Sequence, residues 1–271
     1  MGAGTLIRWF MAFILVVLLA GCGSSSSVVH LPSTPSPERS AISTSASPSR
    51  SSPVASIAAA NTKLVVYGIA STSEATLSSL GNSVAGPVVP YLIRRIGLLA
   101  AAYANAENRT RLGQQPRFPV AIRCWPGQGC TSYTGFRSDT SGRITDFLVN
   151  GQSTPLAIGK DSTGSSGLAV TDVSADVEDQ TGTTVVVFRV RNLGQQAIGS
   201  YTPAFLPVFV TPDGSQFSYD SSTSVLPGPL LAGESVAAIA VFHMRTIIGQ
   251  FTLRTNDQTE QVLVRTTLHM S

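Results

Sequence analysis

The stretch Thr183-Thr184-Val185-Val186-Val187-Phe188-Arg189-Val190-Arg191 decides the fold of the C-terminal part of the chain. Nearly all of its residues are β-branched or aromatic, the types that favour strands. Alternate side chains of a strand point to opposite faces, so both faces of this strand would carry apolar residues. Val185, Val187 and Arg189 alternate with Val186, Phe188 and Val190, which predicts a strand here.

Similar strand signals recur through residues 165–271, as short apolar runs bounded by Gly, Pro and Asp turns. Evenly spaced strands without a convincing helix are typical of an antiparallel β-sandwich, which we predict for this segment. The six further strands expected are 168–177, 205–210, 216–219, 236–243, 250–254 and 260–268.

Three motifs in this segment resemble a family of immunoglobulin-like extracytoplasmic domains of Gram-positive and mycobacterial secreted proteins. They are the strand end Val187–Asn192, the turn Thr211-Pro212-Asp213-Gly214 and the strand residues Val241-Phe242. Either Leu226-Pro227-Gly228 or Leu231-Ala232-Gly233 matches the family's loop between them. The resemblance implies an immunoglobulin-like sandwich outside the cytoplasm and carries over no catalytic residue.

Residues 58–153 predict a separate small α+β domain, with an amphipathic helix and a three-stranded antiparallel sheet. Apolar residues at helical spacing between Val88 and Arg111 predict the helix, with Gly113 as its C-cap. A helix facing the core is our interpretation, and a helix on a membrane surface is the alternative. The three strands expected are 118–122, 131–137 and 143–150, with a turn at 138–142.

The start of this segment is harder to assign. Leu64-Val65-Val66-Tyr67-Gly68-Ile69 favours a short buried strand, and a helix is the alternative for so short an apolar run. A short helix is expected from Ser73-Glu74, with Ser71 or Ser73 as its N-cap.

The N-terminus predicts export and lipid attachment. Arg8 precedes an apolar run of about 12 residues, which is too short to span the ~30 Å hydrocarbon core of a bilayer. The tetrad Leu19-Ala20-Gly21-Cys22 resembles the lipobox of bacterial lipoproteins. The resemblance implies a signal peptide over 1–21, cleavage before Cys22 and diacylglyceryl and fatty acyl chains, such as palmitate, on Cys22. An ordinary signal peptide or an uncleaved anchor with a chance cysteine is the alternative.

Residues 22–57 predict a disordered tether, because Ser, Pro, Ala and Thr dominate them and little apolar surface is available for burial. A flexible coil of this length would span roughly 30–35 Å. The net charge of the chain is +3 without a run of Lys or Arg, which argues against a nucleic-acid partner.

Cys124 and Cys130 flank the turn residues Pro126-Gly127 and are the two cysteines left once Cys22 carries lipid. In an oxidising compartment we predict a disulfide between them, worth roughly 2–3 kcal/mol at most. A redox-active pair is the alternative, although the spacing differs from C-x-x-C.

No catalytic set, metal site or cofactor site is predicted. A serine triad would need His243 with Asp213 or Asp220 folded beside it, and a strand-end surface histidine is the preferred interpretation. The carboxylates of Asp172, Asp176, Glu178 and Asp179 lack EF-hand spacing for calcium.

From these observations we expect a non-enzymatic binding or scaffold module, anchored by lipid on the extracytoplasmic face of the cell membrane. Its partner would be an envelope protein, a wall polymer or an apolar ligand, bound through loops such as Gly194–Tyr201 and Tyr219–Gly228. An accessory subunit of an envelope hydrolase is the alternative, and a spacer within the cell wall is a third interpretation.

Overall fold

The computed structural model describes residues 52–71, 73–105, 112–113, 117–125, 129–178, 181–256 and 259–271. Residues 50–271 form one compact unit. The signal peptide, Cys22 and most of the predicted tether lie outside the described residues. The division into segments 58–153 and 165–271 stays a prediction.

The first helix, α1 (Pro53–Ala70), corrects two expectations. Leu64–Ile69 is helical rather than a strand, and the helix begins inside the segment assigned to the tether. Ser52 is its N-cap, since its hydroxyl accepts a hydrogen bond from the Ala55 N–H at 3.2 Å, and Pro53 occupies the first turn. Val65, Val66 and Ile69 are fully buried, so the helix is fixed by the core that its last two turns enter.

Two more helical elements precede the third long helix. Helix α2 (Glu74–Ser78) has the expected N-cap Ser73, whose hydroxyl accepts from the Thr76 N–H at 3.3 Å, and the 3-10 helix η1 (Ser79–Ser83) follows. Helix α3 (Val89–Asn105) confirms the predicted core helix up to Asn105. Gly113, expected as its C-cap, lies instead in a strand.

The first sheet has four strands in the order β1-β2-β3-β4. They are β1 (Leu112–Gly113), β2 (Ala121–Trp125), β3 (Gly129–Ser138) and β4 (Ile144–Val149), all paired antiparallel. The last three are the predicted strands, with β2 shifted a few residues towards the C-terminus. Asp139 shapes the predicted turn before β4, because its carboxylate accepts from the N–H groups of Ser141 and Arg143, both at 2.9 Å.

The second sheet has nine strands, all antiparallel. Its order is β10-β9-β12-β13-β5-β7-β8-β11, and β6 pairs with β7. All seven strands expected after residue 165 are present. They are β7 (Leu168–Glu178), β8 (Thr183–Asn192), β9 (Phe205–Val210), β10 (Gln216–Ser218), β11 (Ser235–Phe242), β12 (Gly249–Thr255) and β13 (Val262–Met270). The sequence did not predict β5 (Ala157–Gly159) and β6 (Ser162–Thr163), which join the sheet before residue 165.

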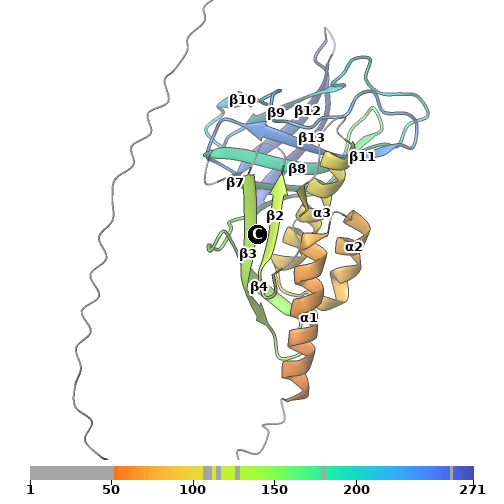
Figure 1. Ribbon diagram of the computed structural model, residues 1–271. Coiled ribbons are helices and arrows are strands. Elements are labelled where there is room, and N and C mark those ends of the chain that lie inside the picture. Colours follow the sequence, from red (N-terminus) through yellow and green to blue (C-terminus); the bar gives the residue numbers. More distant parts are fainter. Residues whose placement is uncertain are drawn as a thin grey trace, which may run out of the picture. The chain divides into compact units, whose positions relative to one another are not determined.

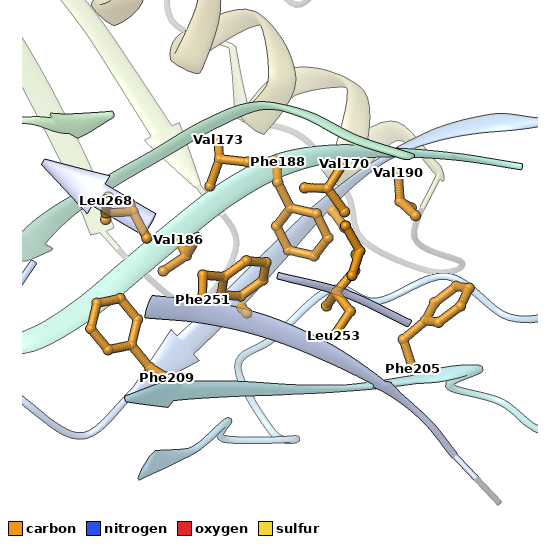
Figure 2. Packing of buried hydrophobic residues seen from close by; sticks show 14 of the residues in the cluster. Val170, Val173, Val186, Phe188, Val190, Phe205, Phe209, Phe251, Leu253 and Leu268 are labelled. Atoms are coloured by element: carbon orange, nitrogen blue, oxygen red, sulfur yellow. The ribbon is translucent and has the colours of Figure 1, made fainter. Parts of the chain in front are cut away.

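The second sheet curls, so that the side chains of its two halves pack face to face (Figure 2). Phe188 of β8 lies 4.9 Å from Phe251 of β12, measured between ring centroids. Phe209 of β9 lies 5.7 Å from Phe242 of β11. The described chain is mainly β, as expected. The aromatic contacts belong to an apolar core between the two halves of the second sheet.

Helix α3 takes part in two cores. Leu92, Ile93 and Ile96 pack with α1 and the first sheet, whereas Leu98 and Tyr103 pack with residues of β8 and β11. Figure 1 shows α3 passing from the green strands β2 to β4 towards β8 and β11. The outer face of β8 and β11 is therefore covered, which explains why the strand quoted at the outset is apolar on both faces.

Candidate functional site

A cavity of about 160 Å³ lies where α3, the β3–β4 hairpin and β7 meet. Its inner wall includes two polar side chains, Arg95 and Tyr133, that are each only 4% exposed. Burying polar groups is costly unless they are paired or serve a ligand, so this cavity is the strongest candidate site in the described chain.

Arg95 is fixed by β7 and β8. Its Nη1 donates to the Ser174 carbonyl oxygen at 2.9 Å and to the Ser174 hydroxyl at 3.3 Å. Its Nη2 donates to the Val185 carbonyl oxygen at 3.0 Å and to the Asp176 carboxylate. The guanidinium is thus held rigidly, and these bonds use Nη1 and Nη2 but not the Nε–H group.

Tyr133 enters the cavity from β3. Burial raises the pKa of Tyr133 to about 12, an effect that the nearby Asp176 carboxylate reinforces and that Arg123 and Arg95 oppose. Its ring packs edge-on against Phe147, with the centroids 6.0 Å apart. Within the described part of the chain its hydroxyl makes no hydrogen bond, and at neutral pH it stays protonated and able to donate.

Two carboxylates from β7 complete the polar part of the lining. Asp176 faces Arg95, and Glu178 is half-buried. The Thr181 hydroxyl donates to Oε2 of Glu178 at 2.9 Å. The cavity therefore offers acceptors as well as donors.

The rest of the lining contains both apolar and polar residues. Leu92, Ile96 and Val185 are buried in the wall, while Asn150 and Gln152 are exposed near the opening. This mixture suits reversible binding of a compact molecule that has both polar groups and hydrocarbon surface.

Two of the acidic residues of β7 considered for calcium, Asp172 and Asp176, pair with arginines of α3 and β8. Asp172 lies 2.9 Å from Nη1 of Arg94 and 3.9 Å from Nε of Arg189, and Arg189 also pairs with Glu74. Asp179 is outside the described residues. No group of three or more potential metal ligands occurs among the residues that were placed.

The structure brings His243 and Asp220 together, with 3.3 Å between Nε2 and Oδ2. Hydrogen bonds from Ser222 and Thr223 hold the pKa of Asp220 at about 2, helped by the charge of His243. The His243 side chain is 73% exposed, as a surface histidine should be, and neither residue lines the cavity. The nearby hydroxyls of Ser222 and Thr223 donate to Asp220, so they do not form a serine–histidine pair with His243.

Asp213, the other aspartate considered as a partner of His243, instead accepts hydrogen bonds from Thr211 and Ser215 within its own turn.

The predicted Cys124–Cys130 disulfide is confirmed. The two cysteines are directly opposite each other on β2 and β3, with their Cα atoms 3.9 Å apart. Cys130 contributes to the cavity lining, so the disulfide fixes the strand that carries Tyr133.

The two loops proposed for partner binding lie away from the cavity. In the first, Ile198 exchanges backbone hydrogen bonds with Leu230, both at 2.9 Å. In the second, Val225 exchanges bonds with Ile239 at 2.8 Å and covers the edge of β11. Tyr201 in the first loop is 57% exposed.

The sequence pattern contained one overlooked signal of this site. Arg95 stands three residues after Leu92 and four before Leu99, in the middle of the apolar face of α3. A charged residue on a buried helix face needs a partner, which pointed to an internal polar contact. Nothing in the sequence connects Arg95 to Tyr133 or Glu178, because the fold alone brings these elements together.

One described helix, α1, is long and apolar enough in composition to cross a membrane, with 22% of the window buried. The same helix contributes Val65, Val66 and Ile69 to the core, as a helix of a folded domain does.

Comparisons with known proteins add little to these observations. No protein-family model matches the chain, and no curated protein matches it. Among solved structures, a conserved hypothetical protein from Bacillus anthracis is similar with 11% identity and a TM-score of 0.18. That match covers 58% of this chain and 96% of the other, and its TM-score is too low to indicate a shared fold.

Proposed function

We propose that this chain is a lipoprotein of the cell envelope that binds a small ligand in the cavity beside Arg95 and Tyr133 without transforming it. The observation that carries the binding role is that two buried polar side chains, one of them without a hydrogen bond to the described residues, line a cavity open to solvent. The anchoring role depends on the lipobox ending at Cys22.

We also propose that the second sheet is an immunoglobulin-like sandwich. Its support is the sequence motifs together with the antiparallel pairing and the face-to-face packing of Phe188 and Phe251. The sandwich would serve as the rigid support on which β7 holds Asp176 and Glu178 beside α3.

A binding role agrees better with this geometry than a hydrolytic one. His243 is exposed, and neither His243 nor Asp220 lines the cavity. These two residues therefore do not form the cleft, with a histidine and a perturbed carboxylate inside it, that would favour a hydrolase. The cavity holds its polar groups rigidly, which favours recognition.

The anchor is tested by metabolic labelling with a fatty-acid probe. The natural chain should carry the label and sediment with membranes, whereas Cys22→Ala should lose both properties and the control Ser24→Ala should keep them. An unlabelled mature chain in the medium, or one that begins at another residue, would contradict the anchoring role.

The cavity is tested by native mass spectrometry of the full mature chain purified from envelopes. We expect a small-molecule adduct that disappears in Ser153→Trp, where an indole blocks the mouth, and persists in the control Ser218→Trp. Ser153 and Ser218 are both exposed, so neither substitution should disturb the fold. An adduct equally present in both variants would place the ligand elsewhere.

A further inference from the structure

The size of the cavity limits what can enter it. A cavity of about 150 Å³ holds a molecule the size of benzene, a single six-membered ring. The cavity beside Arg95 has a volume of about 160 Å³ and opens to solvent near Asn150 and Gln152. One ring therefore fits inside, and larger substituents would extend through the opening.

The charges of the cavity select against anions. The Glu178 carboxylate lines the cavity and would repel a negatively charged ligand. Because Arg95 and Asp176 already neutralise each other, neither is free to serve as the counter-ion of a charged ligand. An uncharged ligand that donates a hydrogen bond to Glu178 is therefore compatible with the lining, and an anion is not.

The hydrogen-bonding groups of the cavity require a ligand that both donates and accepts. Donors are available at the Tyr133 hydroxyl and at Nε of Arg95, since the bonds of Arg95 use Nη1 and Nη2. Glu178 is an acceptor with one oxygen, Oε1, outside its bond to Thr181. A hydroxyl group is one donor and two acceptors, so vicinal hydroxyls satisfy both kinds of partner.

The apolar part of the wall covers the remaining surface of such a ring. Leu92, Ile96 and Val185 are buried hydrocarbon side chains on the inner wall. The C–H face of a polyhydroxylated ring is apolar and can pack against them, whereas its edge carries the hydroxyls.

Resting on the proposed binding function, we propose that the ligand is a neutral polyhydroxylated ring of monosaccharide size, either a free sugar or the terminal residue of an envelope glycan. Tyr133 and Arg95 donate to its oxygens, and Glu178 accepts from one of its hydroxyls.

The proposal is tested by isothermal titration of the full mature chain with free glucose, galactose, mannose, N-acetylglucosamine and myo-inositol, and with short oligosaccharides released from cell-wall glycan. Cyclohexanol is the matched probe with one hydroxyl on the same size of ring, and ethanolamine and acetate are the charged probes. At least one sugar should bind, with cyclohexanol and the charged probes much weaker. If the oligosaccharide binds more tightly than the free sugar, the natural ligand is the end of a glycan polymer. If the two bind equally, the natural ligand is a free sugar.

Matched variants assign the binding to the cavity. Tyr133→Phe should weaken sugar binding about threefold to tenfold, the effect of one lost hydrogen bond. Glu178→Gln should weaken it by a similar factor, because a neutral amide oxygen accepts more weakly than a carboxylate. The controls Tyr201→Phe and Glu260→Gln make the same chemical changes outside the cavity and should leave the affinity unchanged. Thermal unfolding checks that Tyr133→Phe, which keeps the ring against Phe147, is folded.

The outcomes separate this proposal from the proposed function. Cavity-dependent binding of ethanolamine or acetate with no sugar binding would overturn the ligand class and leave the binding function standing. Sugar binding that is equal in all four variants would overturn the assignment to this cavity. Failure of every probe, together with no adduct on the protein from envelopes, would overturn both.

Discussion

The guanidinium of Arg95 in α3 binds the carboxylate of Asp176 in β7, although the two residues are 81 positions apart in the sequence. The neighbouring Arg94 pairs with Asp172 of the same strand at 2.9 Å. Both carboxylates are 24% exposed, but the Arg95 side chain is 4% exposed and that of Arg94 is 55% exposed, so the two ion pairs differ in the burial of their arginine.

This contrast predicts unequal effects of the same substitution. Arg95→Ala should lower the free energy of unfolding by about 2–5 kcal/mol, because a buried side chain and its hydrogen bonds to Ser174, Val185 and Asp176 would be lost. Arg94→Ala should cost at most about 1 kcal/mol, as exposed ion pairs usually do. Urea unfolding followed by circular dichroism measures both, and equal losses would contradict the assignment of Arg95 to the interior.

The core between the two halves of the second sheet gives another matched pair. Leu253 is 0% exposed and Leu231 is 66% exposed (Leu253 is labelled in Figure 2). Leu253→Ala should lower the free energy of unfolding by about 2–5 kcal/mol through lost packing and a new cavity. Leu231→Ala should change it by less than about 0.5 kcal/mol. A small effect at Leu253 would mean that the two halves do not pack as described.

The disulfide should stabilise the fold through the hairpin of β2 and β3. Replacing Cys124 and Cys130 together by Ser should lower the free energy of unfolding by roughly 2 kcal/mol, the value expected for so short a loop. Thiol labelling of the unfolded natural chain, with and without reductant, checks the bond itself. Labelling of both cysteines before reduction would contradict it.

Gly164 permits a close approach of β6 to β13. A Cβ atom at this position would lie 1.6 Å from the carbonyl oxygen of Leu263, whereas a Cβ at Gly81 would meet nothing within 4 Å. Gly164→Ala should therefore cost about 1–3 kcal/mol, since backbone must move to relieve the clash. Gly81→Ala, in the 3-10 helix η1, should be neutral or slightly stabilising. The thermal unfolding midpoints of the two variants test this prediction. Equal midpoints would mean that the backbone at Gly164 does not lie so close to Leu263.

Asp139 should contribute an acid-sensitive part of the stability. Hydrogen bonds from the Ser141 hydroxyl and the Arg143 N–H lower the pKa of Asp139 from 3.8 to about 2. A carboxylate with a lowered pKa in the folded state stabilises the protein above pH 3.8, and this contribution is lost as the pH falls through about 2. The natural chain should therefore exceed Asp139→Asn in urea midpoint at pH 5, and the difference should shrink as the pH approaches 2. A difference that is independent of pH would exclude this linkage.

The sequence predicted the strands after residue 165 well because long apolar runs between turn residues are a strong local signal. It missed β5 and β6, since strands of three and two residues are too short to show a period. At Leu64–Ile69 the β-branched and aromatic residues favoured a strand, but the helix formers before them and the cap at Ser52 extend α1 through this segment. Here the helix preference of the preceding residues and the N-cap outweighed the strand preference of the segment itself.

The candidate site could be predicted only in part. The disulfide was predicted from the two cysteines that remain after Cys22 and from the Pro126-Gly127 turn between them, and the structure confirms it. The meeting of Arg95, Tyr133 and Glu178 followed from nothing local, because α3, β3 and β7 come together through long-range packing. The sequence signal for the cavity was an arginine, Arg95, within the otherwise apolar face of α3.

The participation of α3 in two cores has a practical consequence for recombinant work. A fragment that starts at residue 165 would leave Val187, Ile239 and Val241 uncovered, since Leu98 and Tyr103 would be gone. Such a bare apolar sheet promotes self-association, so the truncated protein should accumulate as insoluble material. Expression trials should keep the chain intact from Ser52 onward.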